Sequence, residues 1–165
     1  MKTIQILTGR YLPGHKDGGP LRTLVNLTDA LGDEYHFRIA ALDRDHGDTK
    51  AYPNIIFNEW NRVGKADVWY VPPKGFSFRF IRTLAKSSDW VYTCGFYDNY
   101  GYKTLILHRL GMLHHKPVVI ASMGVFSQGA LSQKTFKKKF FIVITSTFIS
   151  FFFTANFTLM PNNIT

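Results

Sequence analysis

A glycine-rich, basic stretch near the N-terminus carries the residue types that phosphate binding needs. The stretch 9–22, GRYLPGHKDGGPLR, follows a short apolar run at 4–7 and precedes leucines at helical spacing. Two adjacent glycines remove side chains where the backbone turns, and Pro20 suits the first position of a helix. Backbone N–H groups at a helix start and nearby cations attract an anion, most naturally a phosphate. The candidate phosphate-binding residues are Lys16, Gly18, Gly19 and Arg22.

A tight turn between a strand and a helix that binds nothing would explain the same spacing. The stretch is not G-x-G-x-x-G, and it is not a P-loop because no Gly-Lys-Ser/Thr follows the glycines. Phosphate binding and a plain turn therefore both stay open on the spacing alone.

Two carboxylates at 43 and 45 imitate an Asp-x-Asp metal motif. Asp43 and Asp45 flank Arg44 in a polar loop after an expected strand, and such carboxylates can hold a divalent cation. The other candidate loops carry no carboxylate cluster that would complete an octahedral site. We therefore expect no metal and interpret the segment as a solvated acidic loop, paired with its own arginine.

The remaining polar candidates give single residues rather than sets. Asp98 could contact a sugar hydroxyl of an acceptor, or it could cap the helix expected from Tyr100, and the cap is favoured. The six histidines form no metal-ligand pattern, and the single cysteine, Cys94, is expected to be buried rather than reactive. A hydrolase has little support because no Gly-x-Ser-x-Gly is present.

Composition indicates a globular chain with basic character. The 165 residues are 45% hydrophobic and 16% aromatic, which excludes a disordered chain, and the net charge is +9. Such a charge suggests phosphorylated ligands, an anionic membrane surface or nucleic acid as partners. No nucleic-acid-binding motif is present, so we expect no nucleic-acid partner. No signal peptide is visible, and a cytoplasmic location is expected, with peripheral contact on the inner face of the membrane as an option.

Strands and helices alternate along most of the chain. Strands are expected at 3–8, 35–42, 54–60, 67–71, 89–94 and 117–121, and helices at 20–31, 76–86 and 100–113, with another helix starting at Ala130. The helix at 100–113 is expected to direct Leu105, Ile106, Leu110 and Leu113 inward. This pattern predicts an α/β, Rossmann-like layered fold with a mostly parallel sheet.

Ligands in such folds bind beyond the carboxyl ends of the strands. Three loops are expected there, at 9–19, 95–102 and 122–129, and each contains glycine and polar groups. In the third loop Gly124 would allow a close backbone approach to a bound diphosphate. The convergence of these loops predicts one binding site.

The last 26 residues differ from the rest of the chain. From 140 to 165 there is no charged residue, and the apolar, aromatic run follows three consecutive lysines. A membrane-spanning helix and the product of a frameshift or truncation are both consistent with this composition, and the second is favoured. The expected division is a domain at 1–139 and a tail at 140–165.

Three separated segments together resemble the opening of family 4 glycosyltransferases. They are Leu7 to Gly14 with Gly18-Gly19-Pro20 and Arg22-Thr23-Leu24, then Asp43-Arg44-Asp45 with Gly47-Asp48, and finally Phe126 to Ser132 followed by Lys134 and Lys137 to Lys139. The resemblance covers about residues 1 to 140. It implies the GT-B architecture of two Rossmann-like domains, of which this chain is the N-terminal, acceptor-side one, truncated where the second should begin. Relatives carry Pro-Arg-Gly where this chain has Ser122-Met123-Gly124.

The resemblance implies a glycosyltransferase that moves a sugar from a nucleotide-sugar donor to a glycan or lipid-linked acceptor, without metal or other cofactor. The glycine pair would then approach the donor diphosphate. Two other interpretations stay open: a non-catalytic truncated remnant, and a membrane-anchored binding domain. A Rossmann dehydrogenase is a weaker alternative because the G-x-G-x-x-G motif and a clear acidic ribose ligand are missing.

Overall fold

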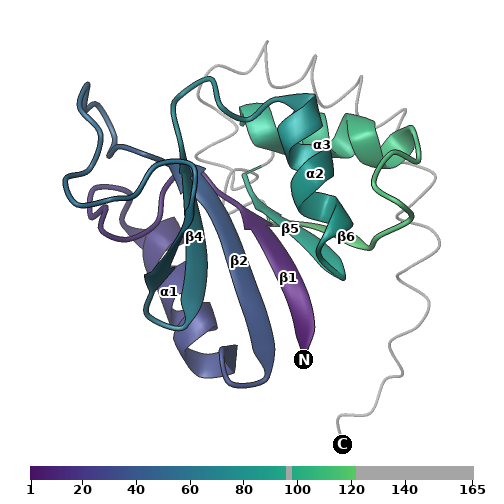
Figure 1. The fold of residues 1–165 in the computed structure, drawn as a ribbon, viewed down its shortest axis with the longest axis horizontal. Coiled ribbons are helices and arrows are strands. Elements are labelled where there is room, and N and C mark those ends of the chain that lie inside the picture. The colour runs from purple at the N-terminus through teal and green to yellow at the C-terminus, as the bar shows by residue number, and fades with distance from the viewer. Residues whose placement is uncertain (96–97, 122–165) are drawn as a thin grey trace, which may run out of the picture. The chain divides into compact units, whose positions relative to one another are not determined.

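Six strands form one sheet in the computed structural model, which describes residues 1–95 and 98–121 (Figure 1). The elements are β1 (Lys2–Leu7), α1 (Gly19–Leu31), β2 (Tyr35–Leu42), β3 (Trp60–Val63), β4 (Ala66–Val71), α2 (Phe78–Lys86), β5 (Trp90–Cys94), α3 (Asn99–Arg109) and β6 (Val118–Ala121). The described residues all belong to one compact unit, Met1–Met123. The expected boundary at 139 and the helix from Ala130 lie outside the described residues.

The sheet is parallel except at one edge. The strand order is β3-β4-β2-β1-β5-β6, and only the β3–β4 pair is antiparallel among the described strands. From β1 the chain moves outward through β2 to the β3–β4 hairpin, and then it crosses back to β5 on the other side of β1. The predicted α/β, Rossmann-like fold with a mostly parallel sheet is confirmed. The chain adds strands to one side of β1 up to β4 and to the other side from β5 onward. The carboxyl ends of β1 and β5 are therefore the topological switch point of the sheet.

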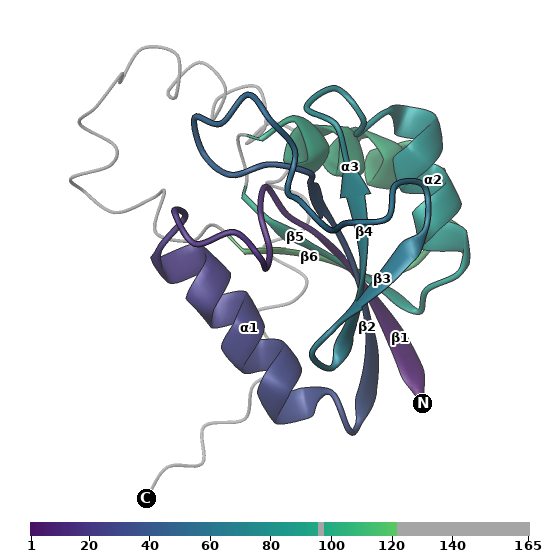
Figure 2. The same cartoon turned by 60° about the vertical axis from the view of Figure 1, so that its left-hand side comes forward.

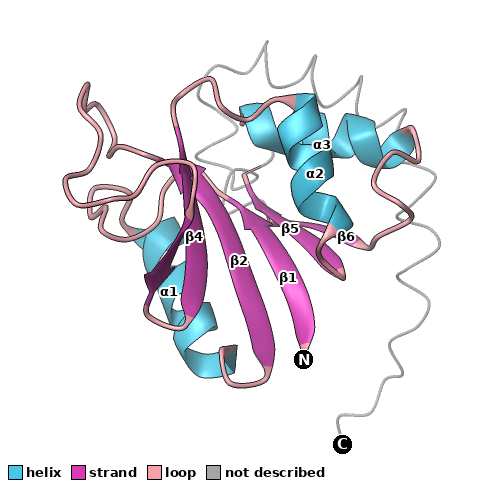
Figure 3. Ribbon diagram, viewed as in Figure 1, coloured by secondary structure: helices cyan, strands magenta, loops and turns pink. Residues whose placement is uncertain are grey.

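Helices cover both faces of the sheet, as Figures 2 and 3 show: α1 lies on one face, and α2 and α3 lie on the other. Alternation along the strands divides the core accordingly, because neighbouring residues point to opposite faces. Ile6 and Phe37 pack on the α1 side with Leu24, whereas Leu7 and Val91 pack with α2 and α3. The register is consistent with this division, since Ile6 pairs with Ile39 and Leu7 with Ala40. Two buried layers of side chains thus hold the sheet between its helices.

The strand expected at 54–60 is wrong. These residues form turns, and the strand β3 begins only at Trp60. Asn54 and Asn58 adopt left-handed backbone conformations, with φ of 63° and 60°, which interrupt a strand. The Asn61 side chain closes this segment by accepting the Ile56 N–H at 2.8 Å and donating to the Ile56 carbonyl at 2.9 Å. A hairpin turns at Gly64, and its two strands are β3 and β4.

The expected inward face of the third helix is also partly wrong. Ile106 and Leu110 are 43% and 65% exposed, and the helix α3 ends at Arg109 rather than at 113. The buried residues are instead Tyr100, Gly101, Thr104 and Leu107, followed by Leu113 beyond the helix. This stripe faces α2 and β5, and the buried Thr104 hydroxyl donates to the Tyr100 carbonyl at 2.7 Å.

None of the three helices in the described part of the chain has the length and apolar character that a membrane span requires. The apolar run from 140 to 165 lies outside the described residues.

Candidate functional site

A buried carboxylate, Asp45, holds the glycine-rich loop in place. Its Oδ2 accepts the backbone N–H groups of His15 at 2.8 Å and Lys16 at 3.2 Å, and its Oδ1 accepts that of His46 at 2.9 Å. Asp45 is only 2% exposed. Burial by itself would raise the pKa of Asp45, but the three N–H donors bring the pKa below its usual value. Asp45 is therefore an ionised clamp between the loop after β1 and the loop after β2.

The neighbouring carboxylate, Asp43, is occupied by its own arginine. Arg44 donates to it from Nε at 2.7 Å and from Nη2 at 3.3 Å, and Asp43 is 3% exposed. The pairing predicted for Arg44 is confirmed, but the expected solvated loop is wrong because both carboxylates are buried. Across residues 1–95 and 98–121, no group of three or more potential metal ligands comes together.

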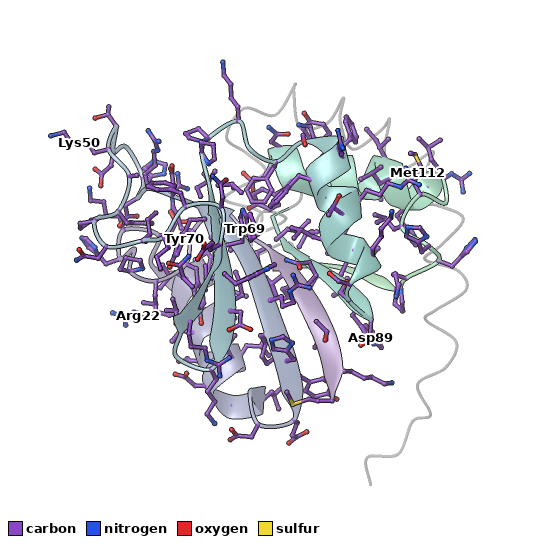
Figure 4. The ribbon with its side chains drawn as sticks, viewed as in Figure 1. Arg22, Lys50, Trp69, Tyr70, Asp89 and Met112 are labelled. Atoms are coloured by element: carbon purple, nitrogen blue, oxygen red, sulfur yellow. The ribbon has the colours of Figure 1, made fainter. Side chains whose placement is uncertain are left out.

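The predicted phosphate-binding residues separate into two environments. Lys16 is held by Asp48, with Nζ 2.6 Å from Oδ1 and both side chains about two-fifths exposed. Gly18 and Arg22 instead line a shallow pocket of about 270 Å³ between the loop and the start of α1, together with His15 and Asn26. Gly18 is the N-cap of α1 and provides no side-chain hydrogen bond to the first turn. Figure 4 shows Arg22 projecting from α1 away from the sheet.

A second polar group lies at the switch point itself, around Gly9 and Gly95. Arg10 and Asp17 form an ion pair at 3.5 Å, and the Asp98 carboxylate lies near both, attracted by Arg10 and repelled by Asp17. Within the described residues, Arg10 Nε is a buried donor without a hydrogen-bond partner. Arg10, Asp17 and Asp98, with the Tyr100 hydroxyl, are named here the switch-point cluster. It places one cation and two carboxylates where α/β folds bind ligands.

Asp98 lies at the N-cap position of α3, but its side chain does not cap the helix. The carboxylate instead accepts from the Tyr100 hydroxyl at 3.2 Å, and Tyr100 also hydrogen-bonds the Cys94 carbonyl. Partial withdrawal from water raises the pKa of Asp98, opposed by the Tyr100 hydrogen bond and by Arg10. The cap favoured from the sequence is thus correct in position and wrong in its hydrogen bond. Asp98 lies in the loop between β5 and α3 and is exposed, so its carboxylate is open to a ligand from solvent.

Gly95 makes room for this carboxylate. Its φ of +116° lies in a region that side chains rarely adopt, and an added Cβ would overlap with the Asp98 carboxylate and lie 3.1 Å from the Tyr100 hydroxyl. Gly14 has a related role in the glycine-rich loop, where an added Cβ would meet Tyr52 and lie 3.0 Å from the Tyr11 carbonyl. By contrast, a Cβ at Gly18 or Gly19 would meet nothing within 4 Å.

Cys94, at the end of β5, is 5% exposed, as predicted for a structural cysteine. Burial raises the pKa of its thiol to about 12, so almost no thiolate is present at neutral pH. We expect native protein to resist iodoacetamide at pH 8 and unfolded protein to react fully, as measured by mass spectrometry. Rapid alkylation of the folded chain would contradict the burial of this residue.

Two tyrosines beside the glycine-rich loop, Tyr52 and Tyr70, were not predicted as part of the site. Tyr52 packs beside Tyr70, with ring centroids 6.1 Å apart, and Tyr70 hydrogen-bonds the Leu12 carbonyl of the glycine-rich loop. Neither tyrosine belongs to a pattern that the sequence analysis singled out. Gly124 lies outside the described residues, so its predicted place beside the diphosphate stays a prediction.

Comparison with protein-family models, with curated proteins and with solved structures finds no match to the chain.

Proposed function

We propose that the chain is the acceptor-side domain of a GT-B-type glycosyltransferase, which moves a sugar from a nucleotide-sugar to a glycan or lipid-linked acceptor. One observation carries the proposal: the glycine-rich loop contributes Arg10 and Asp17 to the switch-point cluster, which lies beside Asp98 at the carboxyl ends of β1 and β5. The resemblance to family 4 glycosyltransferases is a second support. A contribution from a second, donor-binding domain is part of the proposal.

The pocket beside α1 suits the nucleotide-sugar donor, and the switch-point cluster suits the acceptor. The pocket beside α1 offers Arg22 and the backbone N–H groups of an uncapped helix start, which suit the donor diphosphate. The switch-point cluster offers Asp98 and Arg10, a pair that suits hydrogen bonding to sugar hydroxyls. Catalysis would then depend on electrostatic stabilisation of the leaving diphosphate, for which the chain provides positive charge near the pocket.

Donor binding can be tested by ¹H–¹⁵N NMR titration of the chain with UDP-glucose, GDP-mannose, the free diphosphates and the nucleosides. The diphosphate compounds are expected to shift the amides of Gly18, Gly19 and Arg22, whereas uridine and guanosine should leave them unchanged. Arg22→Gln should weaken the response, and Lys50→Gln, which removes an exposed charge from another loop, should not. Equal responses to nucleoside and diphosphate would contradict phosphate recognition at this pocket.

Asp98→Asn is expected to weaken acceptor binding without weakening the fold. Loss of a charged hydrogen bond to a ligand reduces affinity by about tenfold or more. Because the pKa of Asp98 is raised in the folded state, its ionised form opposes folding above about pH 4, and removal of the charge should leave stability unchanged or slightly higher. Glycan-array binding and thermal unfolding measure the two effects, with Asp48→Asn as the matched control. A large loss of stability in Asp98→Asn would indicate a structural residue instead.

The remnant interpretation makes a different prediction. A non-catalytic domain would keep the fold but show no specific response to nucleotide-sugars or glycans, alone or joined to a donor-binding domain. Transfer of a labelled sugar by the joined protein, lost in the variant Asp98→Asn and kept in Asp48→Asn, would exclude the remnant.

A further inference from the structure

The segment that contains α2 is strongly and uniformly basic. Between Asp67 and Asp89 there is no acidic residue, whereas Lys74, Arg79, Arg82 and Lys86 are all present. All four are exposed, and none forms an ion pair within the described part of the chain. The nearest acidic residue that follows, Asp89, accepts the Thr3 backbone N–H at 2.7 Å. Positive charge on this surface is therefore not neutralised by the domain itself.

Helical spacing places three of these cations on one side of α2. Arg79, Arg82 and Lys86 occupy positions i, i+3 and i+7, which lie on the same face of a helix. The opposite face is buried against the sheet through Ile81, Leu84 and Ala85. The helix thus combines an anchored apolar face with a basic outer face, which is named here the α2 basic face.

An aromatic ring lies at the N-terminal end of this face. Phe78 is 43% exposed and stands one helical turn before Arg82. Its ring lies 5.4 Å from the Lys103 ammonium, which also donates to the Phe76 carbonyl at 2.7 Å. A further cation is thereby held beside the exposed ring.

We propose that the α2 basic face, with Phe78 at its end, binds an anionic lipid bilayer surface. The charge is complementary to anionic headgroups, and an exposed aromatic ring beside cations suits the boundary between headgroups and acyl chains. A helix held on a sheet presents a convex surface, which suits a flat bilayer better than the positively charged groove that single-stranded nucleic acid requires. This inference goes beyond the proposed glycosyl transfer, because it involves neither donor nor acceptor.

The test is sedimentation of the full chain with vesicles of phosphatidylcholine alone, or of phosphatidylcholine mixed with phosphatidylglycerol. We expect binding to the anionic vesicles only, and weaker binding at high salt. Arg82→Gln combined with Lys86→Gln should weaken it by about 25-fold, since each cation near an anionic surface contributes roughly fivefold.

The matched control is Lys2→Gln combined with Lys50→Gln, which removes the same charge from other exposed sites. Figure 4 shows Lys50 on its loop, well away from α2. Circular dichroism confirms that both double variants fold. Equal vesicle binding by the two double variants would overturn the proposal. A greater loss of binding to a DNA duplex than to vesicles in the α2 variant would assign the face to nucleic acid and would also overturn it.

Discussion

Replacement of Asp45 by alanine is expected to lower the free energy of unfolding by about 3 kcal/mol. The change leaves three backbone N–H groups, of His15, Lys16 and His46, without the carboxylate that they share. Hydrogen bonds to a buried charge are worth about 1.5–3 kcal/mol each, and solvent can replace part of this loss once the loop opens. For a domain of this size the Tm should fall by roughly 10 °C, measured by calorimetry.

Asp48→Ala is the matched control for this prediction. It removes a carboxylate of the same loop, but one that forms an exposed ion pair with Lys16. Exposed pairs contribute less than about 1 kcal/mol, so the Tm should change little. Similar losses in the two variants would mean that Asp45 is not the clamp of the glycine-rich loop.

The Asp45 clamp also has a defined dependence on pH. Its pKa is lowered in the folded state, so its stabilising contribution is complete above the unfolded pKa of about 3.9 and is lost as the pH falls further. The stability difference between the wild type and Asp45→Ala should therefore stay constant from neutral pH to about pH 4 and shrink below it. Urea unfolding at a series of pH values measures this difference. A difference that shrinks between pH 7 and pH 5 would contradict a lowered pKa.

Gly95→Ala is expected to disrupt the switch-point cluster and to lower the stability of the fold. A side chain at a φ of +116° costs about 1–3 kcal/mol in backbone strain, and the Cβ would displace the Asp98 carboxylate. Acceptor binding should therefore fall together with stability, whereas Asp98→Asn should reduce binding alone. Thermal unfolding and glycan binding of the same samples distinguish the two outcomes.

Gly19→Ala provides the comparison for this substitution. Gly19 begins α1, and a Cβ there meets no atom within 4 Å. Stability should change by less than about 1 kcal/mol, because the restriction of the unfolded chain by alanine is offset by the preference of a residue before Pro20 for extended backbone. Equal destabilisation by Gly19→Ala and Gly95→Ala would show that neither strain nor the Asp98 contact distinguishes Gly95.

Local patterns were sufficient for most elements of the fold. The bounds of β2, predicted at 35–42, agree with the structure, in which the alternating residues Phe37, Ile39 and Ala41 are all buried. The first helix was recognised from the glycine pair, Pro20 and the leucine stripe. The segment 54–60 failed because its β-forming residues, Ile55 to Phe57, lie between two asparagines that turn the backbone.

The candidate site was predicted less completely. The glycine-rich loop and Asp98 were both singled out, and the structure brings their loops to the same edge of the sheet. The role of Asp45 was missed because its partners, the N–H groups of His15 and Lys16, are about thirty residues away and have no side-chain signature. Lys16 was assigned to a phosphate on charge alone, although Asp48 pairs with it.

The sequence by itself determined the order and type of most elements, and hence the doubly covered parallel sheet. These properties follow from hydrophobic periodicity, which depends only on residues that are close together in the sequence. Only the tertiary structure decided which polar groups meet. Whether Asp45 is a metal ligand or a loop clamp, and whether Asp98 is a cap or a member of the switch-point cluster, depends on contacts between distant segments. Burial and partner atoms set the charge and role of such groups, and neither is encoded in residue spacing.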